Sequence, residues 1–152
     1  MDDERTSFSH LTQDGRARMV DVGGKPILVR RAVAEGFVAC GAATVAALRD
    51  RAIPKGDVFS VARVAGIMAA KRTDALIPMC HSLPLDGVSV DLEVRENGVR
   101  IEASASVRAR TGVEMEALTA VTVAALTVYD MCKSVDSAME ITGVRLLEKT
   151  KL

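Results

Sequence analysis

Five polar residues stand out because they interrupt segments that are otherwise largely apolar: His81, Glu114, Glu116, Asp130 and Lys133. Imidazole, carboxylate and ammonium side chains are the groups that most often move protons in enzymes near neutral pH. These residue types therefore predict an enzyme that uses acid–base chemistry. The segments around the five residues decide which of them can act together.

His81 lies in the segment 71–85, KRTDALIPMCHSLPL, where prolines bound a loop. A loop histidine beside a thiol suits proton transfer, and a histidine that only satisfies loop hydrogen bonds is the alternative. Its neighbour Cys80 is better explained as a small buried apolar residue than as a nucleophile. Zinc sites usually pair their ligands as CxxC or HxxxH, and the chain has neither pattern. No metal site is predicted.

Two pairs of charged residues flank one long apolar segment. Glu114 and Glu116 are two residues apart in TGVEMEAL, at an expected helix start, where the helix dipole favours acids even without a catalytic role. Asp130 and Lys133 are three residues apart in YDMCKSVD and would share one helical face. An exposed ion pair is the alternative for the second pair. The apolar turns before it favour a pair that lines a pocket.

An anionic ligand would need lysine or arginine side chains from elsewhere in the chain. Lys55 stands just before a helix expected to start at Asp57, and the free N–H groups of such a start can bind phosphate. A solvated loop lysine is the alternative. Further cations that could join one site are Arg30, Arg31, Lys71 and Arg72.

The composition of the whole chain limits its partners. Twenty Lys and Arg balance twenty Asp and Glu, so no overall charge attracts the chain to nucleic acid or to a membrane surface. No uncharged apolar run approaches the about 18 residues of a membrane span, and the polar start, MDDERTSFSHLTQDGR, lacks the apolar stretch of a secretory signal. Three distant cysteines indicate reduced thiols. We expect a cytoplasmic protein that binds neither nucleic acid nor membrane.

Hydrophobic periodicity predicts the elements that must position the polar residues. The predicted order is strand, helix, helix, strand, strand, helix, strand, with bounds 27–40, 41–51, 57–73, 88–94, 99–107, 113–134 and 138–150. The first strand alternates imperfectly, so a helix is the alternative there. Asn97-Gly98 predicts a type I′ turn, which needs a positive φ at both central residues. Gly143 suggests a bulge in the last strand.

This order predicts an α+β fold of the ferredoxin-like, split βαβ type with one extra helix. One antiparallel sheet would be covered by helices on one face, and its half-polar other face could pair with another subunit. A chain of 152 residues, 49% of them hydrophobic, suits a single domain, with a polar arm at 1–26 and a folded core at 27–150.

The long helix separates its two charged pairs. Glu116 and Asp130 are fourteen residues apart, which at about 1.5 Å per residue places them roughly 21 Å from each other. They cannot serve one small reacting centre from the same copy of the helix. We therefore predict a site that two subunits share.

Five segments carry a resemblance: ARMVDV, PKGDVF, AKRTDALIPMCH, TGVEMEALTAVTVAALTVYDMCK and VRLLEK, which span about Phe8 to Lys149. Together they resemble the cyclic pyranopterin monophosphate synthases, the molybdenum cofactor biosynthesis protein C family. The resemblance implies a lyase that converts 3′,8-cyclo-7,8-dihydroguanosine 5′-triphosphate to cyclic pyranopterin monophosphate and releases pyrophosphate. It also implies a ferredoxin-like homohexamer, a trimer of dimers, with the pocket at a subunit interface.

The resemblance also assigns the site. The catalytic residues would be Asp130, Lys133, Lys55, His81 and Glu116. The substrate-binding residues would be Met79, Cys80, His81, Glu114, Met115, Glu116, Arg30 and Lys71. Of these, Asp130 and Lys133 would act at the ring. The candidates that would neutralise the departing pyrophosphate are Lys55, Arg30 and Lys71. The residue after His81 is commonly proline in the family and is Ser82 here, which leaves the loop less rigid.

No cofactor is expected beyond Mg²⁺ that could accompany the triphosphate. Two other function classes stay open at this point. A non-enzymatic oligomer that binds a nucleotide or pterin would form no product from the cyclised nucleotide. A metal-dependent hydrolase that uses Cys80, His81 and a glutamate would lose activity together with its metal.

Overall fold

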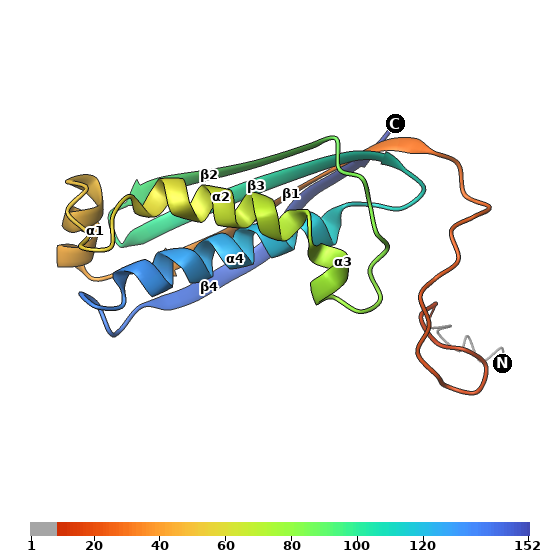
Figure 1. Cartoon of the computed structure of the whole chain (residues 1–152), viewed down its shortest axis with the longest axis horizontal. Helices are drawn as coiled ribbons and strands as arrows, with labels where there is room; N and C mark the ends of the chain where they lie inside the picture. The colour runs from red at the N-terminus through yellow and green to blue at the C-terminus, as the bar shows by residue number, and fades with distance from the viewer. Residues whose placement is uncertain (1–8) are drawn as a thin grey trace, which may run out of the picture.

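The computed structural model describes residues 9–152 (Figure 1). Its elements are β1 (Leu28–Ala39), α1 (Ala42–Arg49), α2 (Val58–Ala70), α3 (Thr73–Leu76), β2 (Gly87–Arg95), β3 (Gly98–Ala109), α4 (Glu114–Cys132) and β4 (Glu140–Lys151). The four strands form one antiparallel sheet in the order β2-β3-β1-β4. Of the predicted arm, residues 1–8 lie outside the described residues.

The helices α2 and α4 lie side by side over one face of this sheet (Figure 1). The sheet order and the two covering helices confirm the predicted α+β, ferredoxin-like fold. The first predicted strand is a strand rather than a helix, because alternate residues such as Ala32, Ala34 and Val38 are buried while the strand pairs on both sides. β1 is therefore a central strand of the core.

The helix predicted for 57–73 is shorter than expected. Asp57 caps its start by accepting a hydrogen bond from the Ser60 N–H, as predicted. Its end lies at Ala70, because Arg72 departs from helical geometry with a φ of −120° and a ψ of 17°, and Thr73 then begins the separate short helix α3. The sequence analysis did not predict α3.

The predicted type I′ turn at Asn97-Gly98 is wrong. Arg95 pairs with Gly98, so the two central residues of the turn are Glu96 and Asn97, and neither has a positive φ. Gly98 belongs to β3 and is required for a different reason. A Cβ at this position would lie 2.7 Å from the ring of Phe37 and would also clash with the carbonyl oxygen of Val38. The glycine allows close packing of β1 and β3.

The predicted irregularity at Gly143 is confirmed. Glu35 pairs with Arg145 and Phe37 pairs with Thr142, so Gly143 and Val144 together stand opposite one residue of β1. Gly143 has a φ of 61°, which favours glycine. This bulge allows β4 to follow β1 with a changed register.

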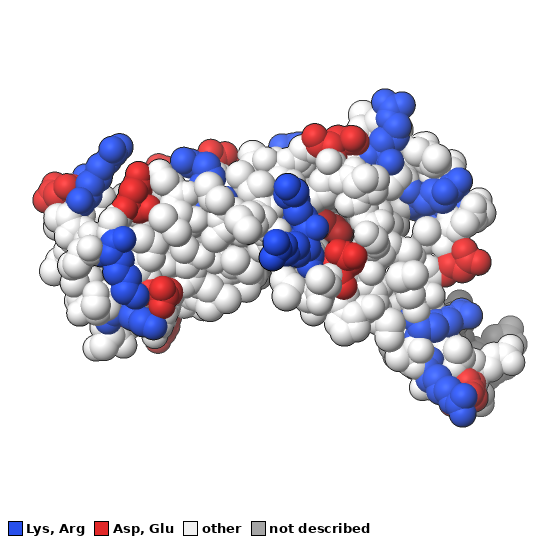
Figure 2. Space-filling model, viewed as in Figure 1, with Lys and Arg blue, Asp and Glu red and all other residues white. Residues whose placement is uncertain are grey.

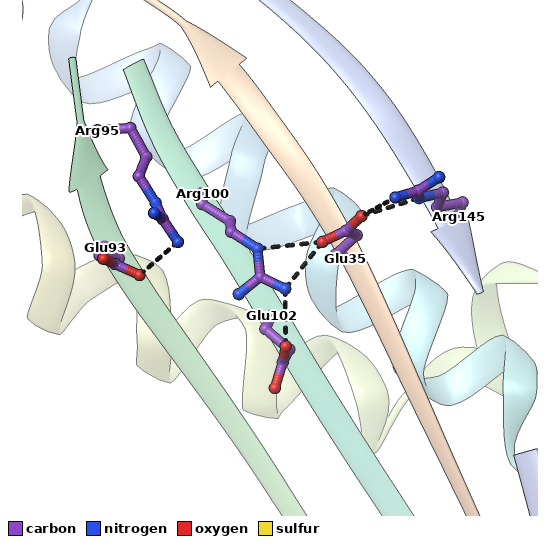
Figure 3. Close-up of polar contacts among 6 residues, drawn as sticks. All are labelled: Glu35, Glu93, Arg95, Arg100, Glu102 and Arg145. Carbon is purple, nitrogen blue, oxygen red and sulfur yellow. Dashed lines mark hydrogen bonds and ion pairs between the residues drawn. The ribbon is translucent and has the colours of Figure 1, made fainter. Parts of the chain in front are cut away.

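The face of the sheet opposite the helices carries a network of ion pairs (Figure 3). Arg100 donates to the carboxylates of Glu35 and Glu102 over 2.8 Å each, and Arg145 approaches Glu35 from the neighbouring strand within 2.7 Å. The hydrogen bonds from Arg145, followed by those from Arg100, hold the pKa of Glu35 below its ordinary value. This network makes the open face partly polar, as predicted.

The helix α4 forms the centre of the core. Within residues 9–152 it is the one helix long and apolar enough to cross a membrane, but 56% of its apolar window is buried inside the protein. Its buried residues include Ala117, Val121, Ala124 and Val128, which pack between α2 and the sheet. Packing rather than intrinsic propensity holds this β-branched helix, and its length keeps its two ends far apart.

Candidate active site

Six of the predicted residues line one cavity of about 300 Å³ at the N-terminal end of α4. They are Met79, Cys80 and His81 from the loop after α3, and Glu114, Met115 and Glu116 from the first turn of α4. The sequence separates these two groups by more than thirty residues, and the fold brings them together because α3 lies beside the start of α4 (Figure 1).

His81 is half-buried and fixed by the segment that precedes β1. Its Nε2 lies 2.6 Å from the carbonyl oxygen of Val20. A carbonyl oxygen only accepts hydrogen bonds, so this nitrogen carries a proton in that contact and Nδ1 is the nitrogen left for other partners. The contact orients the imidazole ring at the wall of the cavity.

The two glutamates of this cavity differ in their electrostatics. Glu116 is only 4% exposed, and burial, assisted by the negative charges of Glu114 and Asp74, raises its pKa. Burial also acts to raise the pKa of Glu114, but the hydrogen bonds from its own backbone N–H and from Lys149 outweigh it and lower that pKa. The cavity thus contains a carboxyl that keeps its proton more readily beside one that loses it more readily, which suits acid–base chemistry.

Cys80 is not a reactive thiolate in this setting. Burial raises the pKa of its thiol, and the nearby charges of Glu116 and Asp74 raise it further. A nucleophilic cysteine needs the opposite surroundings, with positive charge nearby. Cys80 therefore fits the interpretation of a small apolar wall residue.

Arg30 lines a second, adjoining cavity of about 150 Å³ that shares Gly112 and Glu114 with the first. Its guanidinium donates to the carbonyl oxygens of Ala109 at 3.2 Å and Arg110 at 3.1 Å. The sequence analysis did not single out Lys149 of β4, whose Nζ lies 3.0 Å from Glu114. The contact joins residues far apart in the chain, and only strand pairing brings them close.

Two other predicted cations are placed differently. Lys71 lines a separate cavity of about 430 Å³ at the end of α2, together with Ile67 and residues 83–88. Arg31 pairs with Glu148 at 3.6 Å on the surface. Lys71 is therefore separated from Arg30, whereas Arg31 lines the same cavity as Arg30.

The remaining three predicted residues lie at the other end of α4. Lys133 Nζ lies 2.8 Å and Lys55 Nζ 3.5 Å from the carboxylate of Asp130, and Lys55 also donates to the Asp130 carbonyl at 2.9 Å. The hydrogen bond from Lys133, and then its charge and that of Lys55, lower the pKa of Asp130. All three side chains are exposed, so in one chain they form a surface cluster rather than the pocket that was expected.

The helix-bearing face separates these charged groups from one another (Figure 2). Charged side chains gather near the ends of the molecule and in one group between them, with an uncharged expanse in between. Exposed apolar residues of α2 and α4 include Val61, Val64, Met68 and Leu126. In one chain, His81 lines the cavity at the start of α4 and Lys133 lies at the opposite end of that helix.

Metal binding finds no ready set of ligands in this arrangement. Within residues 9–152, no three His, Cys, Asp or Glu side chains are grouped so that they could hold a metal ion. Cys80, His81 and Glu116 line the same cavity but do not form such a group.

Comparison with known proteins identifies relatives over almost the whole chain. The model of the MoaC family matches residues 19–151. Similar curated proteins, each named cyclic pyranopterin monophosphate synthase, come from Corynebacterium efficiens, Nocardioides sp. and Peptoclostridium acidaminophilum. The Corynebacterium efficiens protein is 57% identical over 95% of this chain and 94% of its own length. The Nocardioides protein is 53% identical over 99% of this chain and 94% of its own length. The Peptoclostridium acidaminophilum protein is 52% identical over 94% of this chain and 91% of its own length. The chain belongs to the MoaC family.

Proposed function

We propose that this chain is a cyclic pyranopterin monophosphate synthase of molybdenum cofactor biosynthesis. Its substrate is 3′,8-cyclo-7,8-dihydroguanosine 5′-triphosphate, and its products are cyclic pyranopterin monophosphate and pyrophosphate. Relatives with this name, which match the chain over nearly its full length, support the assignment. The structural observation that carries it is the cavity in which His81 meets two glutamates with opposite pKa shifts.

The reaction calls for the chemistry that these residues offer. Rebuilding the purine-derived ring requires several proton transfers, which His81, Glu116, Asp130 and Lys133 can perform. Forming the cyclic phosphate joins a sugar hydroxyl oxygen to the innermost phosphorus and breaks its bond to the pyrophosphate, which leaves with the electron pair of that bond. Cationic groups such as Lys55 and Arg30 stabilise the charge that develops on the leaving group.

We also propose that each site is shared between two subunits of a homohexamer, arranged as a trimer of dimers. The exposed cluster of Lys55, Asp130 and Lys133 then completes the cavity of a neighbouring copy. Two facts support this arrangement: the cluster lies roughly 21 Å along α4 from Glu116, and the cavity that His81 and Glu116 line includes none of the three cluster residues.

Mixing two inactive variants tests the shared site. His81→Ala disables the cavity end and Lys133→Ala disables the exposed end, and each variant alone should be inactive. If subunits exchange at random within dimers that hold two shared sites, about one quarter of the sites in a mixture regain both intact ends. Recovery of about that fraction of wild-type activity is expected. A mixture as inactive as its components, with exchange confirmed by mass spectrometry, would rule out the shared site.

No resident metal or organic cofactor is needed in this proposal, and Mg²⁺ enters only with the triphosphate of the substrate. The chain acts in the cytoplasm. The direct test is product formation: purified protein, incubated with the cyclised nucleotide, should release cyclic pyranopterin monophosphate and pyrophosphate in equal amounts. Tight binding of the nucleotide without either product would show a binding protein instead of a synthase.

A further inference from the structure

The segment before β1 is built as part of the cavity. Within residues 10–18 the chain forms a small hairpin, in which Leu11 bridges Ala17 and the Arg18 N–H donates to the carbonyl oxygen of His10 over 2.8 Å. Gly15 makes the reversal possible, with a φ of 79°. This hairpin fixes the backbone of His10.

Two contacts attach the same segment to the body of its own chain. The Val20 carbonyl meets the imidazole of His81, and the carbonyl oxygen of Lys25 accepts a hydrogen bond from Arg110 at 3.2 Å. In Figure 1 the segment runs along the end of the molecule that carries α3 and the following loop. The described part of the predicted polar arm is mostly exposed, and these two contacts join it to its own chain.

The segment changes the chemistry of the cavity that it helps to form. Ser9, His10, Val20, Val22 and Lys25 line one side of the cavity. The other side contributes the carboxyls of Glu114 and Glu116 and no lysine or arginine. Lys25 is therefore the one fixed positive charge among the described residues that line this cavity. Both histidines of the chain, His10 and His81, line it as well.

We propose that the segment 9–25 is an integral part of the substrate site and that His10 and Lys25 bind the substrate directly. This inference rests on the proposed function, whose substrate carries a triphosphate. The triphosphate needs positive charge beside the carboxylates of this cavity, and the Lys25 ammonium is the lysine or arginine that the chain's own lining of the cavity provides. His10 offers a ring nitrogen to the same ligand. Both side chains are exposed and so are free to meet it.

Because the chain has only two histidines, their ring signals in nitrogen-15 NMR can be assigned with one variant each, His10→Gln and His81→Gln. The cyclised nucleotide is titrated into a Lys133→Ala variant, in which turnover is slowed. We expect the ring signals of both histidines to move with the same saturation curve. Movement of the His81 signals alone would overturn the inference while leaving the proposed function intact. Movement of neither would overturn both.

Kinetics separates binding from a structural role. Lys25→Met should raise KM about tenfold or more, the loss expected when a charged hydrogen bond to the ligand is removed, with a smaller effect on kcat. Lys25→Arg should recover most of the loss. Arg16→Ala is the matched control, because its side chain lies in the same segment 9–25, is 83% exposed and does not line the cavity. Equal KM values for Lys25→Met and Arg16→Ala would overturn the role of Lys25. If both histidine signals move but wild-type protein forms no product, the substrate contact stands and the proposed synthase fails.

Discussion

Glu114 and Glu116 occupy the same first turn of α4 and line the same cavity, yet their pKa values are shifted in opposite directions. The difference follows from their surroundings. Glu116 is 4% exposed, whereas Glu114 reaches Lys149 at 3.0 Å. One helix turn thus presents to a single ligand one carboxyl that holds its proton more readily and one that releases it more readily.

This difference predicts opposite effects of two amide substitutions on stability. A carboxyl whose folded pKa is raised above the ordinary 4.5 loses stabilising free energy as the pH rises through that pKa. Glu116→Gln should therefore raise the melting temperature at pH 7 and lose this advantage near pH 4. A change of about 1 kcal/mol would appear as about 2–4 °C in a domain of this size.

Glu114→Gln is the matched comparison, because its folded pKa is lowered. The stability that Glu114 contributes is present above its unfolded pKa and is lost as the pH falls through the folded pKa. Glu114→Gln should therefore lower the melting temperature at pH 7. The same direction of change for both variants at pH 7 would contradict the opposite shifts. Thermal unfolding followed by circular dichroism at both pH values is the measurement.

Asp130→Asn should abolish most activity and leave stability almost unchanged. The carboxylate is exposed and its ion pairs with Lys133 and Lys55 are solvated, so their loss should leave the midpoint of urea unfolding almost unchanged. Loss of a general acid or base should lower product formation by about 100-fold or more. Product formation at the wild-type rate in both Asp130→Asn and Lys133→Ala would contradict their catalytic assignment.

Gly36→Ala should destabilise the fold where α4 crosses β1. A Cβ at Gly36 would lie 2.6 Å from Cγ1 of Val121 and 3.3 Å from Cγ2 of Val144. Forcing a methyl group into this packed contact should cost about 1–3 kcal/mol, measured by urea unfolding. Gly24→Ala is the control, because nothing lies within 4 Å of its added Cβ. Equal stability of the two variants would contradict the close contact.

Asp136→Ala should loosen the start of α1. The Asp136 carboxylate accepts hydrogen bonds from the Gly41 N–H and the Thr44 hydroxyl, both at 2.9 Å, and so caps a helix whose own N-cap residue has no side chain. Its loss should cost about 1–2 kcal/mol at pH 7.

The pH dependence of that loss provides a control. Hydrogen bonds from Gly41 and then Ala138 lower the pKa of Asp136 below its ordinary 3.8, so its contribution is present above that value and disappears as the pH falls through the folded pKa. The difference between wild type and Asp136→Ala in free energy of unfolding should therefore shrink in acid. A difference that stays constant from pH 7 to pH 3 would show that the carboxylate charge is not involved.

Local patterns in the sequence predict most of the elements. The apolar run between Glu116 and Asp130 predicts a helix at 113–134 that the structure places at Glu114–Cys132, and alternation predicts both strands of the β2–β3 hairpin. The turn type predicted for that hairpin was wrong. Gly98 is required because a larger residue would clash with Phe37 and Val38 on another strand, not because of the turn. A local turn pattern cannot reveal such a contact.

The site is predictable to a similar extent. Residue types and the family resemblance place His81, Glu114 and Glu116 together, and the structure brings them into one cavity. Two of their contact partners are distant in sequence: Lys149 is 35 residues from Glu114, and Val20, whose carbonyl contacts the imidazole, is 61 residues from His81. Only the pairing of strands and the folding back of the arm bring such residues close, and neither is visible in a local pattern.

The bulge in β4 also decides on which face of the sheet the following side chains of that strand lie. If the register at Phe37 and Thr142 continued without it, Arg145 would stand opposite Ala34, beneath the helices, and Leu146 opposite Val33 on the open face. The one extra residue in the bulge thus keeps the arginine on the open face opposite Glu35 and the leucine opposite Ala34. We expect a relative that lacks one residue at Gly143 or Val144 to lose the bulge and to keep the remaining pairs of β4 with β1.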